Sequence, residues 1–121
     1  MNKILLTGST GFIGSALLDN LSKNNKIYIT LRKKNKIHHK NKNISKIYFD
    51  DYNKLNQKLK KIKVNIVIHC ATHYVKKHKY DDLKKLSNAN ILFGNIILEN
   101  LGVMNVKKFI NFSTVWTDYN G

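Results

Sequence analysis

The chain has 121 residues, enough for one domain with a hydrophobic core. Its 42% hydrophobic and 10% aromatic content predicts a globular protein, and no apolar run approaches the roughly 20 residues of a membrane span. The short apolar N-terminus leads directly into a glycine motif and does not resemble a signal peptide, so we expect a cytoplasmic protein with no membrane partner. The single cysteine, Cys70, excludes an internal disulfide framework.

The charge is strongly basic. Lys and Arg number 22 against 7 Asp and Glu, for a formal net charge of +15. Such an excess can indicate a nucleic-acid or anionic-membrane partner. Here the basic residues are nearly all lysines scattered among asparagines, and there is no zinc-finger spacing, helix-turn-helix pattern or RNA-binding aromatic signature. We therefore expect no nucleic-acid partner and interpret most of the charge as solvated surface.

Strands and helices alternate in the first half of the chain. An apolar strand is predicted at Lys3–Thr7, a helix over residues 15–22 and a β-branched strand over residues 27–31. Residues 33–43 are basic, polar and unpatterned, which indicates an exposed loop. A third strand is predicted at Ile44–Phe49.

The second half continues this alternation. Asn53 is placed to cap a helix with apolar residues at i, i+4 and i+7. The nearly continuous apolar run at residues 64–70 is typical of a central parallel strand buried on both faces. A long helix is predicted from about residue 81 to residue 101, ended by Gly102, and a fifth strand over residues 108–112. This order predicts an α/β fold, a doubly wound parallel sheet of the Rossmann type with about five strands.

A glycine motif lies between the first predicted strand and the first predicted helix, and it consists of Thr7, Gly8, Ser9, Thr10, Gly11, Phe12, Ile13 and Gly14. Glycine is needed where the chain turns tightly out of the strand, where the backbone approaches a pyrophosphate, and where the helix packs closely on the sheet. The helix N-terminus adds free N–H groups and a partial positive charge. In this context the motif predicts a dinucleotide-binding loop rather than an ordinary tight turn.

The motif T-G-x-x-G-F-I-G resembles that of the extended short-chain dehydrogenase/reductases, the NAD(P)-dependent epimerases, dehydratases and reductases of nucleotide sugars. Three further segments match this family in order. Residues 68–72 resemble its H-x-A-A stretch, residues 88–95 are similar to its N-[VI]-x-G-[TS] segment, and residues 112–114 resemble its F-S-[ST] exit from the fifth strand. The resemblance covers the whole chain, and residues 69–74 are most similar to the CDP-abequose/paratose type.

This resemblance implies site residues. The small side chains that follow the fourth strand, at Cys70, Ala71 and Thr72, would let the cofactor lie against the backbone. A buried Asn90 would bridge the sheet and the active-site wall. Thr114, with Ser113 beside it, would hydrogen-bond a hydroxyl or carbonyl of the substrate, although ordinary polar residues at a strand end are the alternative.

Arg32, the only arginine, bears on the choice of dinucleotide. In this kind of fold an acidic residue at the end of the second strand binds the 2′-hydroxyl of NAD, whereas an arginine accommodates the 2′-phosphate of NADP. Residues 20–49 contain no Asp or Glu, and Arg32 is followed by two lysines. We therefore expect NADP rather than NAD, with a solvated charge as the alternative for Arg32. The resemblance places Asp50 or Asp51 near the adenine ring.

The family's Tyr-x-x-x-Lys pair, which transfers the proton, is expected after the fifth strand and is absent there. Tyr80 has Lys84 four residues later, but this pair precedes the long helix. We therefore expect residues 1–121 to be an incomplete dinucleotide-binding domain without the substrate domain, inactive alone. The family would transfer hydride on a sugar carbon of a nucleotide sugar and form homodimers. The alternative is a non-catalytic dinucleotide-binding fragment or gene remnant.

A metal site was weighed against this interpretation. His69, Cys70, His73 and His78 are close in sequence. Adjacent residues of a strand point to opposite faces, which separates His69 from Cys70. We expect no metal.

Overall fold

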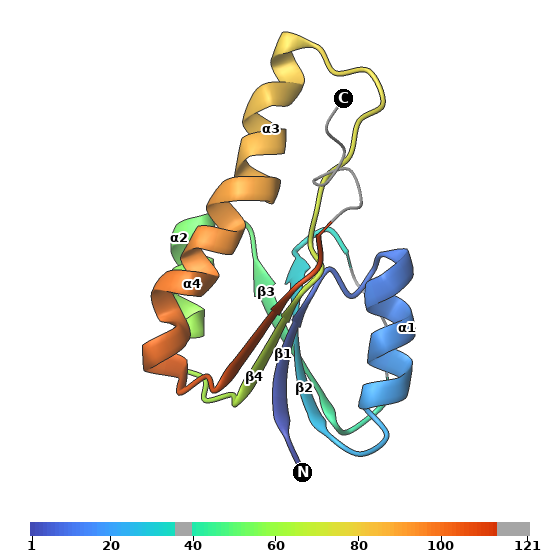
Figure 1. The fold of residues 1–121 in the computed structure, drawn as a ribbon, viewed down its shortest axis with the longest axis vertical. Coiled ribbons are helices and arrows are strands. Elements are labelled where there is room, and N and C mark those ends of the chain that lie inside the picture. The colour runs from blue at the N-terminus through green and yellow to red at the C-terminus, as the bar shows by residue number, and fades with distance from the viewer. Residues whose placement is uncertain (36–39, 114–121) are drawn as a thin grey trace.

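The computed structural model describes residues 1–35 and 40–113. Its strands are β1 (Lys3–Thr7), β2 (Lys26–Arg32), β3 (Ile44–Phe49), β4 (Ile66–His69) and β5 (Lys108–Asn111). They form one parallel sheet in the order β3-β2-β1-β4-β5 (Figure 1). The chain therefore adds β2 and β3 on one side of β1 and then β4 and β5 on the other side, which confirms the doubly wound Rossmann-type fold.

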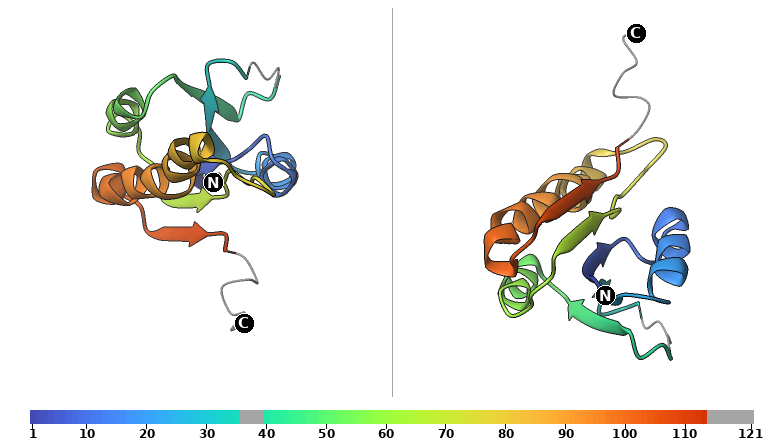
Figure 2. Two further views of the ribbon diagram at one scale, coloured as in Figure 1. Left: turned by 90° about the horizontal axis from the view of Figure 1, so that it is seen from above. Right: turned by 60° about the horizontal axis from the view of Figure 1, so that its bottom comes forward.

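Helices cover both faces of the sheet (Figure 2). α1 (Phe12–Leu21) packs on one face, whereas α2 (Tyr52–Leu59) and α4 (Phe93–Met104) pack on the other. Successive side chains of a strand point to opposite faces, so Leu5 belongs to the core under α2 and α4 while Leu6 belongs to the core under α1. No helix in the described part of the chain has the length and hydrophobicity needed to cross a membrane.

The long helix expected before β5 differs from the prediction. It consists of η1 (Tyr80–Asp82), α3 (Leu83–Ser87), the π-helical turn η2 (Asn88–Leu92) and α4. Its first half projects beyond the sheet (Figure 1). The helix does not end at Gly102, because the fully buried Met104 extends its core face by another turn. Asn105 ends it with φ 64°, a left-handed conformation that asparagine tolerates.

Two other helix ends were also predicted wrongly. α1 begins at Phe12, three residues before the predicted start at residue 15. α2 is capped by Asp51 rather than Asn53, because an Asp51 carboxylate oxygen accepts the backbone N–H of Lys54 at 2.8 Å. An acidic cap also interacts favourably with the positive end of the helix dipole, which explains why the helix starts earlier.

Candidate functional site

The glycine loop leaves β1 at the edge of the sheet where the parallel strands end. Gly8 has φ +72°, and a Cβ there would lie 2.7 Å from the backbone of Cys70 and Ala71. A Cβ on Gly14 would lie 1.9 Å from the carbonyl oxygen of Gly8, so the start of α1 rests directly on the loop. Gly11 is different, because its Cβ would meet only the Gly8 oxygen at 3.4 Å. Two of the three glycines thus close the loop, and the third leaves its outer side open.

Thr7 joins this loop to the end of β4. Its hydroxyl oxygen accepts the backbone N–H groups of Cys70 at 3.2 Å and Ala71 at 3.1 Å. The same oxygen lies 2.7 Å from Nδ1 of His69. Because the two N–H groups occupy its lone pairs, the hydroxyl donates its proton to Nδ1, which leaves the His69 proton on Nε2. Burial lowers the pKa of His69, which favours this neutral imidazole.

Two features of the loop suit an anion. The first N–H groups of α1 have no acceptor within the helix, and Gly11, which precedes them, provides no side-chain cap. The Ser9 side chain is 3% exposed, and its hydroxyl has no hydrogen-bond partner among the described residues. Thr10, Phe12 and Ile13 are exposed. A buried hydroxyl without a partner is uncommon and fits a loop that is completed by a ligand.

Arg32 ends β2 beside Phe49, its neighbour on β3. The guanidinium lies 4.8 Å from the ring centroids of both Phe49 and Tyr52 and donates to the Tyr52 hydroxyl at 2.5 Å. Arg32 is nevertheless exposed. Aromatic contacts therefore hold a cation in place at this edge while leaving it accessible to a ligand.

The two candidate acids of the adenine region have other partners. A carboxylate oxygen of Asp50 lies 3.0 Å from Nζ of Lys54 and 3.6 Å from Nζ of Lys33. The hydrogen bond from Lys54 lowers the pKa of Asp50 to about 2, so this carboxylate is ionised at neutral pH. Asp51 caps α2. Both acids lie at the carboxyl end of β3, close in sequence to Tyr52.

The segment after β4 is attached to the long helix by Asn90. The Asn90 side-chain oxygen accepts the hydroxyl of Thr72 at 3.0 Å and the backbone N–H of His73 at 2.7 Å. Its amide nitrogen donates to the carbonyl of His73 at 2.9 Å. Asn90 is exposed, so the expectation of a buried residue is wrong, because the helix here lies beyond the sheet that would cover it. Cys70 and Ala71 are half-buried, and burial raises the pKa of the Cys70 thiol.

A hollow of about 280 Å³ separates this helix from β5. His69, Thr72, Asn90, Gly94 and Phe112 contribute to its wall. The Phe112 N–H donates to the carbonyl of His69 at 3.2 Å, so the exposed Ser113 follows beside the end of β4. Thr114, the other candidate for substrate contact, lies outside the described residues.

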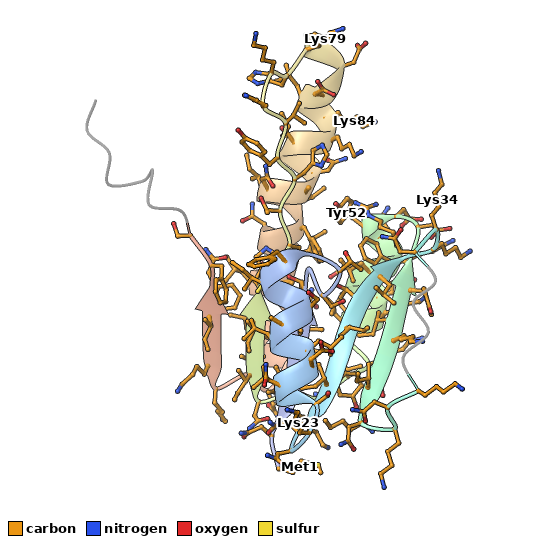
Figure 3. All side chains as sticks on the ribbon, turned by 90° about the vertical axis from the view of Figure 1, so that its right-hand side faces the viewer. Met1, Lys23, Lys34, Tyr52, Lys79 and Lys84 are labelled. Atoms are coloured by element: carbon orange, nitrogen blue, oxygen red, sulfur yellow. The ribbon has the colours of Figure 1, made fainter. Side chains whose placement is uncertain are left out.

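The Tyr80 and Lys84 pair stands apart from all of these groups. Lys79 and Lys84 mark the far tip of the projecting helix, whereas Lys34 and Tyr52 mark the end of the sheet (Figure 3). Tyr80 is 86% exposed. Among the residues described, no three His, Cys, Asp or Glu side chains are grouped so that they could hold a metal ion.

Sequence reasoning missed the roles of Thr7 and Phe49 and the wide turn at Asn88–Leu92. Thr7 had a recognisable signal, because it is the one polar side chain among the four buried residues of β1. The turn also had one. The family segment quoted above separates its asparagine from its glycine by two residues, whereas Asn90 and Gly94 are separated by three.

The sheet order, the closed glycine loop and the strand-end residues define a dinucleotide-binding α/β domain. The model of the NAD dependent epimerase/dehydratase family matches residues 4–117. The chain therefore belongs to this family. None of the curated proteins compared with the chain matches it significantly.

Solved structures support the same fold. A UDP-glucuronic acid 4-epimerase from Bacillus cereus, in complex with UDP-4-deoxy-4-fluoro-glucuronic acid and NAD, is 27% identical with a TM-score of 0.77, and the match covers 98% of this chain and 43% of that one. The epimerase Mth375 from Methanothermobacter thermautotrophicus is 24% identical with a TM-score of 0.78, over 98% of this chain and 37% of that one. The Bordetella bronchiseptica enzyme WbmH in complex with NAD+ is 23% identical with a TM-score of 0.74, over 96% and 40%. This chain therefore spans less than half the length of these proteins.

Proposed function

We propose that this chain is the cofactor-binding part of a nucleotide-sugar epimerase, dehydratase or reductase, and that its dinucleotide is NADP. The observation that carries the proposal is the glycine loop, closed against β4 by Gly8 and Thr7, with the buried Ser9 hydroxyl unpartnered among the described residues. An ordinary turn has no need of such a hydroxyl, whereas a phosphate-binding loop does.

Each part of the edge has a role in this proposal. The glycine loop and the N-terminus of α1 would bind the pyrophosphate, and Asp50 or Asp51 would lie near the adenine. Cys70, Ala71 and Thr72 would form the backbone wall along the cofactor. When bound, the nicotinamide exchanges a hydride with the substrate. Ser113 and Thr114 would orient an oxygen of that substrate.

The preference for NADP rests on Arg32. Its guanidinium is accessible and already oriented by Phe49 and Tyr52, so little side-chain entropy is lost when it binds a phosphate. Asp50, which directly follows the neighbouring strand β3, is engaged by two lysines and is therefore a poor partner for a ribose hydroxyl. Structural relatives have been solved with NAD, so a preference for NAD over NADP is the competing hypothesis.

Calorimetric titration with NADPH and NADH tests the proposal. The chain should bind NADPH more tightly, and Arg32→Ala should weaken NADPH binding by about 1 to 3 kcal/mol while changing NADH binding little. Gly11→Val should abolish binding of both, because its branched side chain would fill the open side of the loop, where a Cβ meets only the Gly8 oxygen at 3.4 Å. Equal affinities for the two dinucleotides, unchanged by Arg32→Ala, would remove Arg32 from the site.

The substrate proposal is a nucleotide sugar, with the 4-keto sugars of the abequose and paratose type favoured by residues 69–74. The sequence has its one Tyr-x-x-x-Lys pair at Tyr80 and Lys84, at the tip of the projecting helix. Among residues 1–35 and 40–113, no group near the glycine loop then has the tyrosine's role, so residues 1–121 alone should bind the cofactor without turnover. NADPH oxidation with a panel of nucleotide 4-keto sugars tests this, and turnover by the isolated chain would refute it.

Self-association is the remaining proposal. Leu83, Ile91 and Leu98 on the long helix and Ile110 and Phe112 near β5 are all at least 38% exposed. β5 is an edge strand of the sheet that the described residues form, and apolar surface next to such an edge favours contact with a second copy or with further chain. Sedimentation of the chain over a concentration series should show association, and a monomer at all concentrations would contradict it.

A further inference from the structure

The strands are all parallel, so they start at the same end of the sheet, opposite the glycine loop. We call this end the amino end, and it consists of the segments 1–3, 22–26, 40–44, 60–66 and 105–108, which lead into the strands. Every one of these segments contains lysine, and none contains Asp or Glu. The lysines are Lys3, Lys23, Lys26, Lys40, Lys42, Lys60, Lys61, Lys63, Lys107 and Lys108. The fold therefore gathers at one end a positive charge that is scattered along the sequence.

The acidic residues of the described chain lie outside the amino end. Asp50 and Asp51 follow β3 at the opposite, carboxyl end of the sheet, and Asp81 and Asp82 lie among the lysines of the projecting helix. The others lie within α1 and α4. Among the described residues, no ion pair joins an acid to a lysine of the amino end, where Figure 3 labels Lys23. The positive charge there is thus not offset by local pairing.

The row of strand starts is level. Lys3 of β1 lies opposite Lys26 of β2 in the register of the sheet. The backbone N–H of Asn65 donates to the carbonyl of Lys3 at 2.9 Å, and the N–H of Lys107 donates to the carbonyl of Asn65 at 2.9 Å. Neighbouring strands therefore begin in step across the sheet, and lysine occupies most of the places in this row.

Asparagines, rather than lysines, hold the amino end together. The Asn65 side-chain oxygen accepts the backbone N–H of Lys3 at 2.7 Å, and its amide nitrogen donates to the side-chain oxygen of Asn2 at 2.8 Å. Among the lysines, Lys63 donates from Nζ to the carbonyl of Val103. The other lysines of the amino end form no side-chain hydrogen bond or ion pair with the described residues. Their cations therefore stay available to a partner.

We propose that the amino end docks onto an anionic membrane surface, with its lysines on the lipid headgroups. Lysines beside a negatively charged leaflet are attracted to it within a Debye length, about 10 Å at 0.1 M salt. Many lysines act together here, because the strands beside them start at one level. Such attraction needs neither an apolar span nor a signal peptide, so the features that predict no membrane partner do not exclude it.

Lipid is favoured over nucleic acid by the side chains that the amino end lacks. The one arginine, Arg32, ends β2 at the opposite end of the sheet, so no guanidinium is available to read base edges. Among the described residues, no aromatic side chain of the amino end is exposed for bases to stack on. Met1, which is 89% exposed, is aliphatic and suits the boundary between headgroups and acyl chains.

Sedimentation with lipid vesicles tests the proposal. The chain should bind vesicles of phosphatidylcholine with about 30% phosphatidylserine at about 0.1 M salt and leave them at about 0.5 M salt, where the Debye length is shorter. It should not bind vesicles of phosphatidylcholine alone. Absence of binding to the anionic vesicles, or binding that depends on neither phosphatidylserine nor salt, would overturn the proposal.

Two variants of equal charge locate the surface. The first combines Lys3→Gln, Lys61→Gln, Lys107→Gln and Lys108→Gln, and it should bind the anionic vesicles at least about tenfold more weakly. The matched control removes the same charge from the projecting region through Lys76→Gln, Lys77→Gln, Lys84→Gln and Lys85→Gln, and it should bind nearly as well as the parent. All of these lysines are exposed, so the urea midpoints should not change.

A charge-retaining variant controls for the fold. Arginine at the positions changed in the first variant keeps the charge and should restore binding to the anionic vesicles. Equal losses in the two glutamine variants would show that net charge, and not the amino end, drives adsorption, and would overturn the proposal. Failure of the arginine variant to bind would overturn it as well.

Two further measurements distinguish lipid from nucleic acid and docking from cofactor binding. Duplex DNA that removed the chain from the vesicles at an equal phosphate concentration would identify nucleic acid as the partner and overturn the lipid proposal. NADPH should bind the vesicle-bound chain as tightly as the free chain, because the glycine loop lies at the opposite end of the sheet. A lower affinity on vesicles would place the carboxyl end against the lipid and overturn the proposal. Absence of NADPH binding by the free chain would instead refute the proposed function, and the vesicle results would still decide the docking.

Discussion

Replacing Thr7 with valine should destabilise the chain severely although the shape of the side chain is preserved. Thr7 is 0% exposed, and its hydroxyl is bonded to the N–H groups of Cys70 and Ala71 and to Nδ1 of His69. Each buried polar group left without a partner costs about 1 to 3 kcal/mol. The Cys70 N–H also donates to the backbone carbonyl of Thr7 at 3.3 Å, a bond that the substitution keeps, so the groups left without a partner are the Ala71 N–H and Nδ1 of His69. Ala71 is only half-buried, which favours the lower end for its N–H group. We therefore expect a loss of about 2 to 4 kcal/mol, a large part of the 5–15 kcal/mol roughly typical of a domain.

Thr7→Ser is the matched control, because it keeps the hydroxyl and removes one methyl group, at a cost of about 1 kcal/mol. Urea unfolding followed by circular dichroism gives the free energy of unfolding of the parent and both variants. If Thr7→Val proved as stable as Thr7→Ser, the hydroxyl would not be holding the end of β4, and the assignment of the His69 proton to Nε2 would lose its basis.

Three further predictions concern the same edge of the sheet. Ser9→Ala should raise the free energy of unfolding by up to about 1 kcal/mol, because it removes a buried hydroxyl that has no partner among the described residues. The same change should weaken NADPH binding, and calorimetry that showed unchanged affinity would refute a role for Ser9 in binding. Because burial lowers the folded pKa of His69 below its usual 6.5, the unfolded chain takes up the proton first, so stability should fall as pH drops below about 6.5. Urea midpoints at pH 7.5 and 5.5 should differ less in His69→Asn. Gly8→Ala should cost about 2 to 4 kcal/mol through its positive φ and backbone contacts, whereas Gly11→Ala should be nearly neutral in the same unfolding assay.

The strands were predictable because each is a short, mainly apolar run, a pattern that does not fit a helix or a loop. The parallel pairing of β1 with both β2 and β4 then follows from the alternation with helices. The helix ends were less predictable. Gly102 satisfies the local preference for a helix end, but burial of Met104 two residues later outweighs it, and Asn105 accepts the left-handed conformation instead.

The site was predictable where backbone geometry dictates the residue type, as at Gly8 and Gly14. It was less so where the partner is remote in sequence. The bonds of Thr7 to the end of β4 span more than 60 residues, and the contacts of Arg32 with Tyr52 span 20. Asp50 and Asp51 were chosen by resemblance, and the lysine partners of one and the capping role of the other emerge only once β3 and α2 are placed.

The central position of β1 also has a consequence for the order in which a newly made chain can acquire its structure. β1 is synthesised first, but its second neighbour, β4, begins at Ile66. Until that stretch has left the ribosome, the Thr7 hydroxyl lacks its three partners and the glycine loop has nothing to close against. Non-local pairings of this kind form late and slowly. The nascent chain should therefore be unable to capture a dinucleotide until more than half of its residues have been translated, although the loop itself is finished by Gly14.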